Sequence, residues 1–278
     1  MRSPIVLRAS WVATAVASVL ALATPVATSL TGPTPEPTPV ARETRPPELS
    51  EPFGDGMGAV SAGQAEVAAP SAPEPAAPKG HLLVRVPRDM AVRANPNPDA
   101  SVVGTMPSGS KYYDVPITAW VEDVSPDGRW GRVEIPYVWP RRHGWILLRD
   151  LARRTTGVEV QVDLSEHRIT VTRFGRSLFG MPAATGAVIS PTPPGEYFVT
   201  DRIAFSGGSL GTFAFGISGI QPNLPPGWNG GNQLAIHGTN DPSSIGRSAS
   251  AGCLRVSERS LDRLKPLLAL GTPVLVVR

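Results

Sequence analysis

Short apolar runs separated by turn-forming residues fill the chain from His81 to its carboxy terminus. Runs such as HLLVRV, GRVEI and VEVQVDL are too short for a typical helix and are rich in the β-branched residues that favour strands. The sequence of 278 residues also contains 31 prolines and 28 glycines, which interrupt long helices. We therefore predict a mainly β fold with little helix.

Residues 1–30 carry the features of an export signal. Arg2 and Arg8 precede an apolar stretch at 11–22, and the small residues at 21 and 23 fit a signal-peptide cleavage site. The stretch is shorter than the ~20 apolar residues that cross a bilayer as a helix. The uncharged sequence after it keeps an uncleaved N-terminal membrane anchor open as an alternative. Both alternatives predict an exported protein of the extracytoplasmic envelope, in the periplasm or the cell wall.

Residues 31–80 are predicted to form a disordered linker. The segment consists largely of Pro, Ala, Glu and Thr, as in TGPTPEPTPV and APSAPEPAAPKG. Such a composition buries too little apolar surface to offset the conformational entropy lost on ordering. We expect a tether between the export segment and the folded part of the chain.

Charge and metal-ligand content argue against several classes of protein. The net charge is +3, the pI is near 9.3 and no basic run is present, so we predict no nucleic-acid partner. The four histidines show no ligand-like spacing, and the single cysteine excludes an intrachain disulfide. We predict neither a metal site nor a cofactor.

Residues 81–153 contain closely spaced strand-like runs that predict a small β-barrel. Their short motifs resemble those of bacterial SH3-like domains, and the matching positions are Val92-Arg93, Val103-Gly104, Gly109, Trp130 with Val133, and Gly144-Trp145-Ile146. The resemblance implies binding to cell-wall peptide or glycan. We expect Trp130 and Trp145 in the core. The aromatic residues expected to be exposed are Tyr112, Tyr113, Tyr137 and Trp139.

Residues 154–278 predict a second β domain. Apolar and polar residues alternate over Val158–Leu164 and again over 169–172, which predicts a hairpin. Ser257 is expected to cap a helix that Pro266 kinks or ends. Further strands are expected at 197–200, 234–236 and 274–277.

A stretch rich in Gly, Ser and Pro at 203–232 lacks clear periodicity. Such a long segment beside a candidate site favours a lid or a substrate loop. Its aromatic residues are expected either to line a groove or simply to pack, and they are Phe205, Phe213, Phe215 and Trp228.

Cys253 lies sixteen residues after His237, and each has a glycine neighbour, Gly252 and Gly238. A thiol is nucleophilic only as a thiolate, which is a few per cent of an unperturbed cysteine of pKa about 8.5 at neutral pH. A neighbouring imidazole raises that fraction. A lone cysteine or histidine is more often structural, but the two in this arrangement favour a thiol nucleophile with a histidine base.

This arrangement is similar to the signature of the L,D-transpeptidase catalytic family of the YkuD type. The signature reads here as His237-Gly238 followed by Ser250-Ala251-Gly252-Cys253-Leu254-Arg255. Ala251 stands where many members carry histidine or lysine, so any role of that side chain is absent. The segment Thr192-Pro193-Pro194-Gly195-Glu196-Tyr197 resembles a further family element, for which we expect a structural role.

The resemblance implies a β-sandwich catalytic domain with little helix over residues 154–278 and gives the motif residues roles. Cys253 is the expected nucleophile and His237 the general base. The carbonyl of Gly238 is expected to orient the imidazole, and the N–H of Gly252 to stabilise the oxyanion. Substrate contacts are expected from Arg255, Ser250 and Thr239, although a surface ion pair for Arg255 and a loop-orienting role for Ser250 stay open.

The function implied is a peptidoglycan L,D-transpeptidase acting on stem peptides. It forms a cysteine thioester, releases D-alanine and makes 3→3 crosslinks, and carbapenems are expected to acylate Cys253. One alternative is an L,D-carboxypeptidase or another cysteine hydrolase of stem peptides, since both share the first half-reaction. A second is a non-catalytic wall-binding protein in which the SH3-like region dominates.

Overall fold

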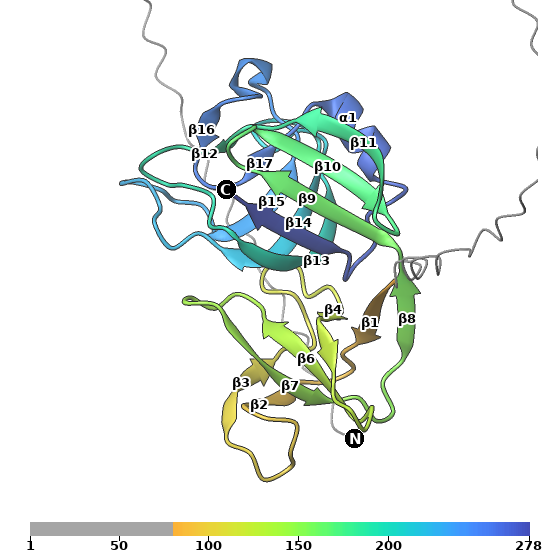
Figure 1. Ribbon diagram of the computed structural model, residues 1–278. Coiled ribbons are helices and arrows are strands. Elements are labelled where there is room, and N and C mark those ends of the chain that lie inside the picture. The colour runs from red at the N-terminus through yellow and green to blue at the C-terminus, as the bar shows by residue number, and fades with distance from the viewer. Residues whose placement is uncertain (1–79) are drawn as a thin grey trace, which may run out of the picture. The chain divides into compact units, whose positions relative to one another are not determined.

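The computed structural model describes residues 80–278, shown in Figure 1. The expected export segment 1–30 lies outside the described residues, as does the expected linker except for Gly80. Within 80–278, no helix has both the length and the apolar character needed to span a membrane.

The amino-terminal strands form two small antiparallel sheets (Figure 1). One has the order β4-β1-β8 and the other β3-β2-β7-β6-β5. The strands are β1 (His81–Arg85), β2 (Met90–Arg93), β3 (Val102–Met106), β4 (Thr118–Val121), β5 (Asp123–Val124), β6 (Trp130–Ile135), β7 (Arg142–Leu147) and β8 (Arg153–Thr156). Their inward residues share one apolar cluster that includes Val84, Val92, Met106, Val133 and Ile146.

The carboxy-terminal strands form an eight-stranded mixed sheet with the order β11-β10-β9-β18-β13-β14-β15-β17. The strands are β9 (Val158–Asp163), β10 (Arg168–Arg173), β11 (Arg176–Pro182), β13 (Gly195–Ala204), β14 (Phe213–Ile220), β15 (Gln233–His237), β17 (Leu254–Arg255) and β18 (Pro273–Val277). A separate parallel pair joins β12 (Thr185–Gly186) to β16 (Ser248–Ser250), and a 3-10 helix, η1, covers Pro242–Ser244.

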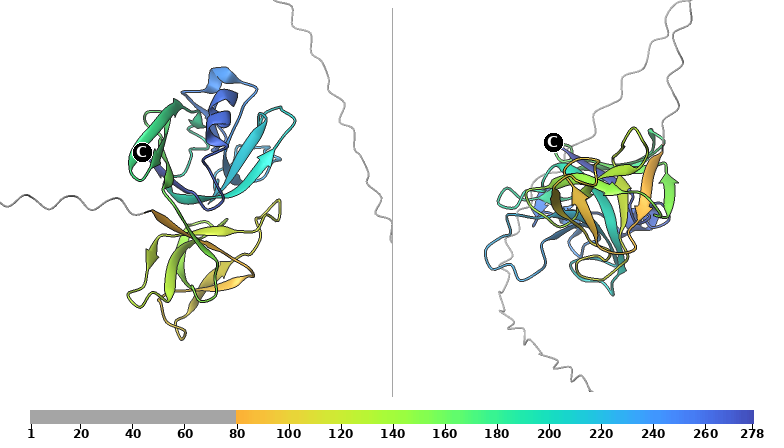
Figure 2. Two further views of the ribbon diagram at one scale, coloured as in Figure 1. Left: turned by 90° about the vertical axis from the view of Figure 1, so that its right-hand side faces the viewer. Right: turned by 90° about the horizontal axis from the view of Figure 1, so that it is seen from below.

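The large sheet curves around helix α1 (Glu258–Leu264), as Figure 2 shows. Leu261 and Leu264 on this helix join the same buried cluster as Val160 of β9 and Phe215 of β14. Ser257 caps the helix by accepting a hydrogen bond from the Ser260 N–H at 3.2 Å. The predictions of a mainly β fold and of a short helix ending before Pro266 are confirmed.

The stretch at 203–232 differs from its prediction as a continuous loop. Its centre is β14, an inner strand of the large sheet whose residues 214–219 are all buried. A strand buried on both faces needs no alternation of apolar and polar residues, so periodicity missed it. The flanking segments, 205–212 and 221–232, are the irregular parts.

The two sets of strands share buried contacts. Phe198 of β13 is 1% exposed and packs in the amino-terminal cluster. Glu134 of β6 accepts a hydrogen bond from Ser218 of β14 and another at 2.7 Å from Arg141 Nε. Burial raises the pKa of Glu134 to about 7, although the Arg141 charge opposes that shift. The amino-terminal strands are therefore part of the structure on which the large sheet rests.

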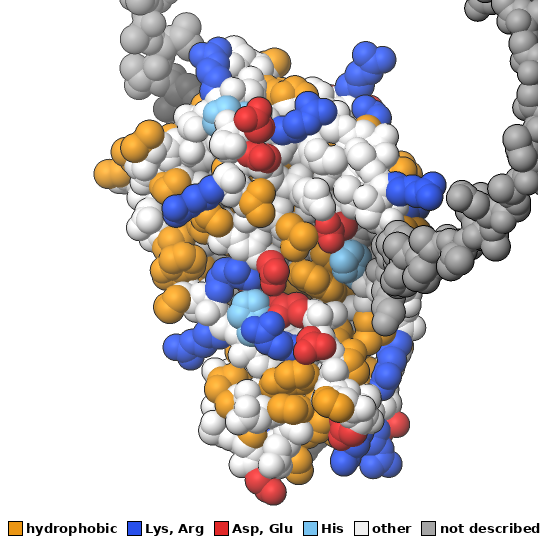
Figure 3. All heavy atoms as spheres, viewed as in Figure 1, with side chains coloured by type: hydrophobic (Ala, Val, Ile, Leu, Met, Phe, Trp, Pro, Cys, Tyr) orange, Lys and Arg blue, Asp and Glu red, His pale blue; other side chains and the backbone are white. Residues whose placement is uncertain are grey.

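Ion pairs surround this junction on the surface. Figure 3 shows acidic, basic and histidine side chains next to one another over the middle of the molecule. Among the ion pairs of the described residues, His143 and Arg132 each contact Glu122, and His81 contacts Glu159 at 3.2 Å. The carboxylates of these pairs are only 6% and 14% exposed, so the pairs are partly buried.

Candidate active site

Strand alternation places the two reactive side chains on one face of the large sheet. In β15 the residues Leu234 and Ile236 point into the core, whereas Ala235 and His237 line a cavity on the other face. The neighbouring strand repeats this pattern, with Leu254 in the core and the residues on either side of it in the cavity wall. A period of two in both strands therefore exposes the histidine and the cysteine to the same space.

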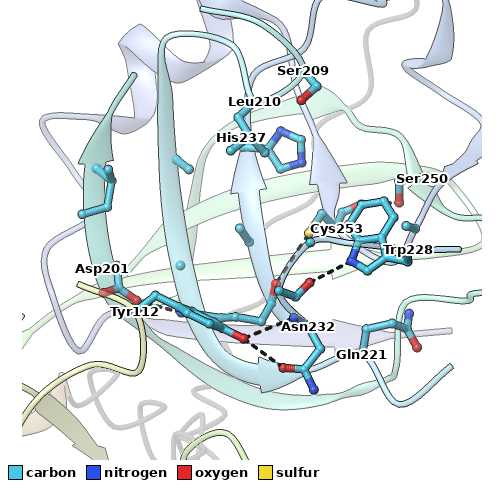
Figure 4. Close-up of a pocket in the computed structure, with 18 of the residues that line it drawn as sticks. Tyr112, Asp201, Ser209, Leu210, Gln221, Trp228, Asn232, His237, Ser250 and Cys253 are labelled. Atoms are coloured by element: carbon cyan, nitrogen blue, oxygen red, sulfur yellow. Dashed lines mark hydrogen bonds between the residues drawn. The ribbon is translucent and has the colours of Figure 1, made fainter. Parts of the chain in front are cut away.

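The register of β15 and β17 fixes how far apart the pair stands. Ile236 pairs with Leu254 and His237 with Arg255 in parallel fashion, so Cys253 lies beside Ala235. Ideal strands ~4.8 Å apart, with ~3.3 Å per residue, put the Cα atoms of His237 and Cys253 roughly 8 Å apart. Side chains of this length on one face can meet across such a diagonal. Figure 4 shows the imidazole and the sulfur turned toward one cavity.

The resting thiol hydrogen-bonds elsewhere. Cys253 Sγ donates to the Gln233 carbonyl at 3.8 Å, and no hydrogen bond joins it to the imidazole within residues 80–278. Burial raises the pKa of the Cys253 thiol, although an N–H from Ala235 and the Arg255 charge oppose the shift. The side chain nevertheless keeps partial exposure. The structure thus holds a protonated thiol at the cavity wall.

His237 is buried, with 4% of its surface exposed. Its Nδ1 lies 2.5 Å from the carbonyl oxygen of Gly238, and since a carbonyl only accepts, Nδ1 carries the proton. The other nitrogen, Nε2, is then a free base. Burial lowers the pKa of His237 to about 4 despite the Gly238 hydrogen bond, and the Arg255 charge lowers it further. At neutral pH the pair is an uncharged imidazole and an uncharged thiol.

Hydroxyl groups brace the turn that carries Cys253. Ser250 Oγ donates to the Cys253 carbonyl at 2.6 Å and accepts from the Gly252 N–H at 3.0 Å. From the neighbouring segment, Thr192 Oγ1 donates to the Gly252 carbonyl at 2.8 Å and Ser190 Oγ to the Ala251 carbonyl at 3.0 Å. These contacts fix the backbone next to the sulfur, and Ser250, which also lines the cavity, orients this turn.

The prediction for the Gly252 N–H needs correction. This N–H is already engaged by Ser250 Oγ, so it is not free to stabilise an oxyanion. Gly252 is required for a different reason, since its φ of +113° lies in the region that favours glycine. The sequence alone shows a glycine at 252 but does not show that its N–H is already hydrogen-bonded.

Of the remaining residues predicted to contact substrate, one lines the cavity and one does not. Arg255 lines the cavity, and its guanidinium forms no ion pair with any residue of 80–278, which argues against the surface-pair alternative. Its Nε is buried without a hydrogen-bond partner in the same part of the chain. Thr239 lies outside the cavity lining, and its hydroxyl accepts from the Asp241 N–H at 3.0 Å. The substrate contact of Thr239 stays a prediction.

The cavity has a volume of about 600 Å³, enough for a peptide of several residues. One wall is the sheet face of β13, β14 and β15 that carries His237. Four further segments complete the lining, represented by Tyr112 and Tyr113, Phe205 and Leu210, Leu224 and Trp228, and Ser250 and Cys253. Phe215 is fully buried in the core instead. Within residues 80–278, no cluster of three or more His, Cys, Asp or Glu side chains is arranged to hold a metal ion.

Several contacts of the site are not predicted from the sequence. Ser190 and Thr192 act on the nucleophile turn from about sixty residues upstream. Tyr112 and Tyr113 were predicted as exposed aromatics for wall binding, yet they line the same cavity as Cys253. Only the tertiary pairing of distant segments reveals these contacts.

Residues 157–276 match the family model described as the L,D-transpeptidase catalytic domain, YkuD. The YkuD protein of Bacillus subtilis is 27% identical over 124 residues, which cover 45% of this chain and 68% of that protein. The YkuD protein of Bacillus licheniformis is 31% identical over 121 residues, which cover 40% and 66%.

Among solved structures, a Bdellovibrio bacteriovorus protein is 23% identical, with a TM-score of 0.37 over 44% of this chain and 48% of that one. The chain thus spans about half the length of that structure. The match to the family model includes strand β15, which ends in His237, and Cys253, which directly precedes strand β17. Residues 157–276 are therefore similar to L,D-transpeptidase catalytic domains of the YkuD type.

Proposed function

We propose that this protein is a peptidoglycan L,D-transpeptidase that forms 3→3 crosslinks through a thioester on Cys253. The observation that carries the proposal is the free Nε2 of His237 on the same sheet face as the thiol, beside a cavity of peptide size. The match of residues 157–276 to the L,D-transpeptidase family supports the same reaction class.

The first half-reaction needs one proton to move twice. When substrate enters, the Cys253 proton passes to Nε2 of His237 and the thiolate attacks the carbonyl carbon of the third stem residue. The carbonyl electrons move to oxygen, and the N–H of Cys253 is the oxyanion donor that we assign in place of Gly252. Collapse expels the amine of D-alanine, which takes the proton from His237, and leaves a thioester.

The second half-reaction regenerates the thiol. The side-chain amine of another stem peptide attacks the thioester and loses a proton to His237, and the sulfur leaves as a thiolate that regains that proton. The new amide is the 3→3 crosslink. Water in place of the amine gives a carboxypeptidase, which remains the second candidate because both reactions share the acyl-enzyme.

The groups next to His237 determine which end of the donor peptide lies on that side of the sulfur. The imidazole must reach the leaving amine, so the leaving D-alanine lies on the His237 side of the sulfur. Arg255 is the strand partner of His237, and its Nε has no hydrogen-bond partner within residues 80–278. We assign Arg255 to bind the terminal carboxylate of the leaving D-alanine. The acyl part of the donor then extends toward the opposite end of the cavity.

The amino-terminal strands and the segment before them complete the proposal. We assign 81–153 to an SH3-like domain that binds wall material, and 1–30 to an export signal or membrane anchor. The small antiparallel sheets and their shared core support the first assignment. The enzyme then acts outside the cytoplasm, on the cell wall.

Analysis of muropeptides from cell walls treated with the purified full chain tests the function. We expect dimers joined 3→3 and released D-alanine with wild type, and neither product with Cys253→Ala. Release of D-alanine without dimers would assign a carboxypeptidase. Retention on walls with no turnover would instead favour the non-catalytic binding protein.

A further inference from the structure

We infer that Tyr112 and Tyr113, from the amino-terminal strands, form the wall of the acyl-donor subsite for an extended peptide of three residues. This inference rests on the proposed function and names the part of the substrate that the far end of the cavity holds. Both tyrosines line the cavity that contains Cys253, and each is 48% exposed. Exposed aromatic faces enclosing a cavity are suited to contact peptide planes and methyl groups.

The loop that carries the tyrosines is anchored at its base. Ser110 is buried, its N–H donates to the Val115 carbonyl at 2.9 Å, and its Oγ accepts from the Val115 N–H at 3.1 Å. The Asp114 N–H also returns to the Ser110 carbonyl at 3.2 Å. These bonds hold the two ring-bearing positions as a rigid projection from the amino-terminal strands.

The tip of the loop is fastened to the segment that precedes β15. Tyr112 Oη donates to Asn232 Oδ1 at 3.3 Å and accepts from the Asn232 N–H at 3.4 Å (Figure 4). Lys111 Nζ donates to the same Oδ1 at 3.0 Å. A Cβ atom at Gly231 would lie 2.9 Å from the Tyr112 ring, so glycine permits this approach. The contact is thus specific to the two segments.

The position of Asn232 sets the length of substrate that reaches this wall. Asn232 lies three residues before Ala235, the position beside Cys253. At ~3.3 Å per residue this is roughly 10 Å along the strand, the length of three extended residues. A donor cut after its third residue carries three residues on this side of the sulfur. A carbapenem or a donor truncated to its last two residues does not extend so far.

Trp228 faces the same region from the other side. It lines the cavity, is 47% exposed, and is held by a hydrogen bond from its Nε1 to the Gly231 carbonyl at 3.0 Å. The donor peptide therefore lies between aromatic side chains of the 224–232 segment and those of the amino-terminal loop. The cavity of the catalytic domain is incomplete without the preceding strands.

The test compares three acylating substrates on full-length variants: a stem tetrapeptide, its two-residue carboxy-terminal fragment with a blocked amine, and a carbapenem. For the double variant Tyr112→Ala/Tyr113→Ala we expect kcat/KM with the tetrapeptide to fall about tenfold or more, chiefly through KM. Acylation by the fragment and by the carbapenem should stay within about twofold of wild type, which also reports an intact fold.

Two further variants sharpen the result. Tyr112→Phe keeps the ring but loses the bonds to Asn232, and we expect a smaller loss confined to the tetrapeptide. Trp139→Ala removes an aromatic residue that is 51% exposed but outside the cavity lining, and should change none of the three rates. An equal loss with all three substrates, or no loss with the tetrapeptide, would overturn the inference.

The inference and the proposed function can fail separately. If wild type is acylated by none of the three substrates, the proposed function fails and the inference with it. If wild type accepts all three and the tyrosine variants match it, only the inference fails. Dependence of the loss on an attached disaccharide instead of on peptide length would also count against a peptide subsite.

Discussion

The two ends of the cavity are built in opposite ways. At the reacting end, His237 ends strand β15 and Cys253 directly precedes its partner strand β17, and hydroxyls of Ser250 and Thr192 fix the backbone around the sulfur. At the outer end, Tyr112 and Trp228 project from irregular segments and are about half exposed. Chemistry thus rests on strand register, where a displacement of 1 Å matters, and substrate choice rests on loops that vary more easily.

The difference predicts that changes at the reacting end affect every substrate alike, whereas changes at the outer end affect long substrates only. It also predicts that few substitutions at the reacting end preserve activity.

Loss of the sulfur should have the largest effect. We expect Cys253→Ala to abolish acylation by stem peptides and by carbapenems equally, since Cys253 is the single cysteine of the sequence. Intact-mass spectrometry after carbapenem exposure should show an adduct on wild type and none on the variant. An adduct that persists on the variant would place the nucleophile elsewhere.

Removal of the base comes next. His237→Ala should lower the acylation rate by about 10²- to 10⁴-fold with every acyl donor, because the thiol pKa is raised and the proton has no acceptor. Stopped-flow measurement of carbapenem acylation provides the rate. A loss limited to the tetrapeptide would contradict the division between the two ends.

Acylation should be lost only at a pH near 4 or below. The pKa of His237 is lowered to about 4, so the free imidazole persists as pH falls from neutral and is protonated below about 4. We expect kcat/KM for acylation to have an acidic limb near pH 4, with about a tenfold loss one unit below it. A limb near the ordinary histidine pKa of about 6.5 would show that the imidazole is more solvated than its burial indicates.

The brace on the nucleophile turn should matter less than the reacting groups. Thr192→Val removes the hydroxyl that donates to the Gly252 carbonyl and accepts from the Gly186 N–H, leaving two buried backbone groups unpaired. We expect a stability loss of about 2 kcal/mol and a moderate fall in rate with all donors. Chemical denaturation and carbapenem acylation measure the two. Thr192→Ser, which keeps the hydroxyl, should recover both.

The smallest effect on the reaction is expected from Glu134, where the amino-terminal strands contact the large sheet. Because the folded pKa of Glu134 is raised to about 7, the folded state binds its proton more tightly than the unfolded state does. The contribution of this group to stability therefore falls as pH rises from about 4.5 to about 7. Unfolding in denaturant at pH 5 and pH 8 should show a smaller decrease for Glu134→Gln than for wild type. Equal decreases would argue that Glu134 is ionised throughout.

Local pattern predicted much of this fold. The alternation in Val158–Leu164, the cap at Ser257 and the stop at Pro266 all depend on interactions within a few residues, and the structure has each of them. Strand β14 was missed because its glycines and its burial on both faces remove the alternation that marks a half-exposed strand. Prediction failed where the surrounding structure, instead of the local sequence, determines the secondary structure.

The same limit applies to the site. The spacing of His237 and Cys253 indicated the reacting pair, and the Gly238 carbonyl does lie on Nδ1. The Gly252 N–H is occupied by Ser250 Oγ within a local turn, whereas Tyr112 approaches Asn232 from a segment far away in the chain. Spacing alone contains no information about such contacts.

The burial of Phe198 has a consequence for how the molecule can be divided. This ring belongs to the catalytic sheet by chain position, but it fills a place among Val133, Ile146 and their neighbours. Cutting the chain at residue 157 would leave the ring in water, at a loss of about 2 kcal/mol. Melting of the small sheets should then be transmitted directly to the reacting strands, and both halves should unfold in a single cooperative step.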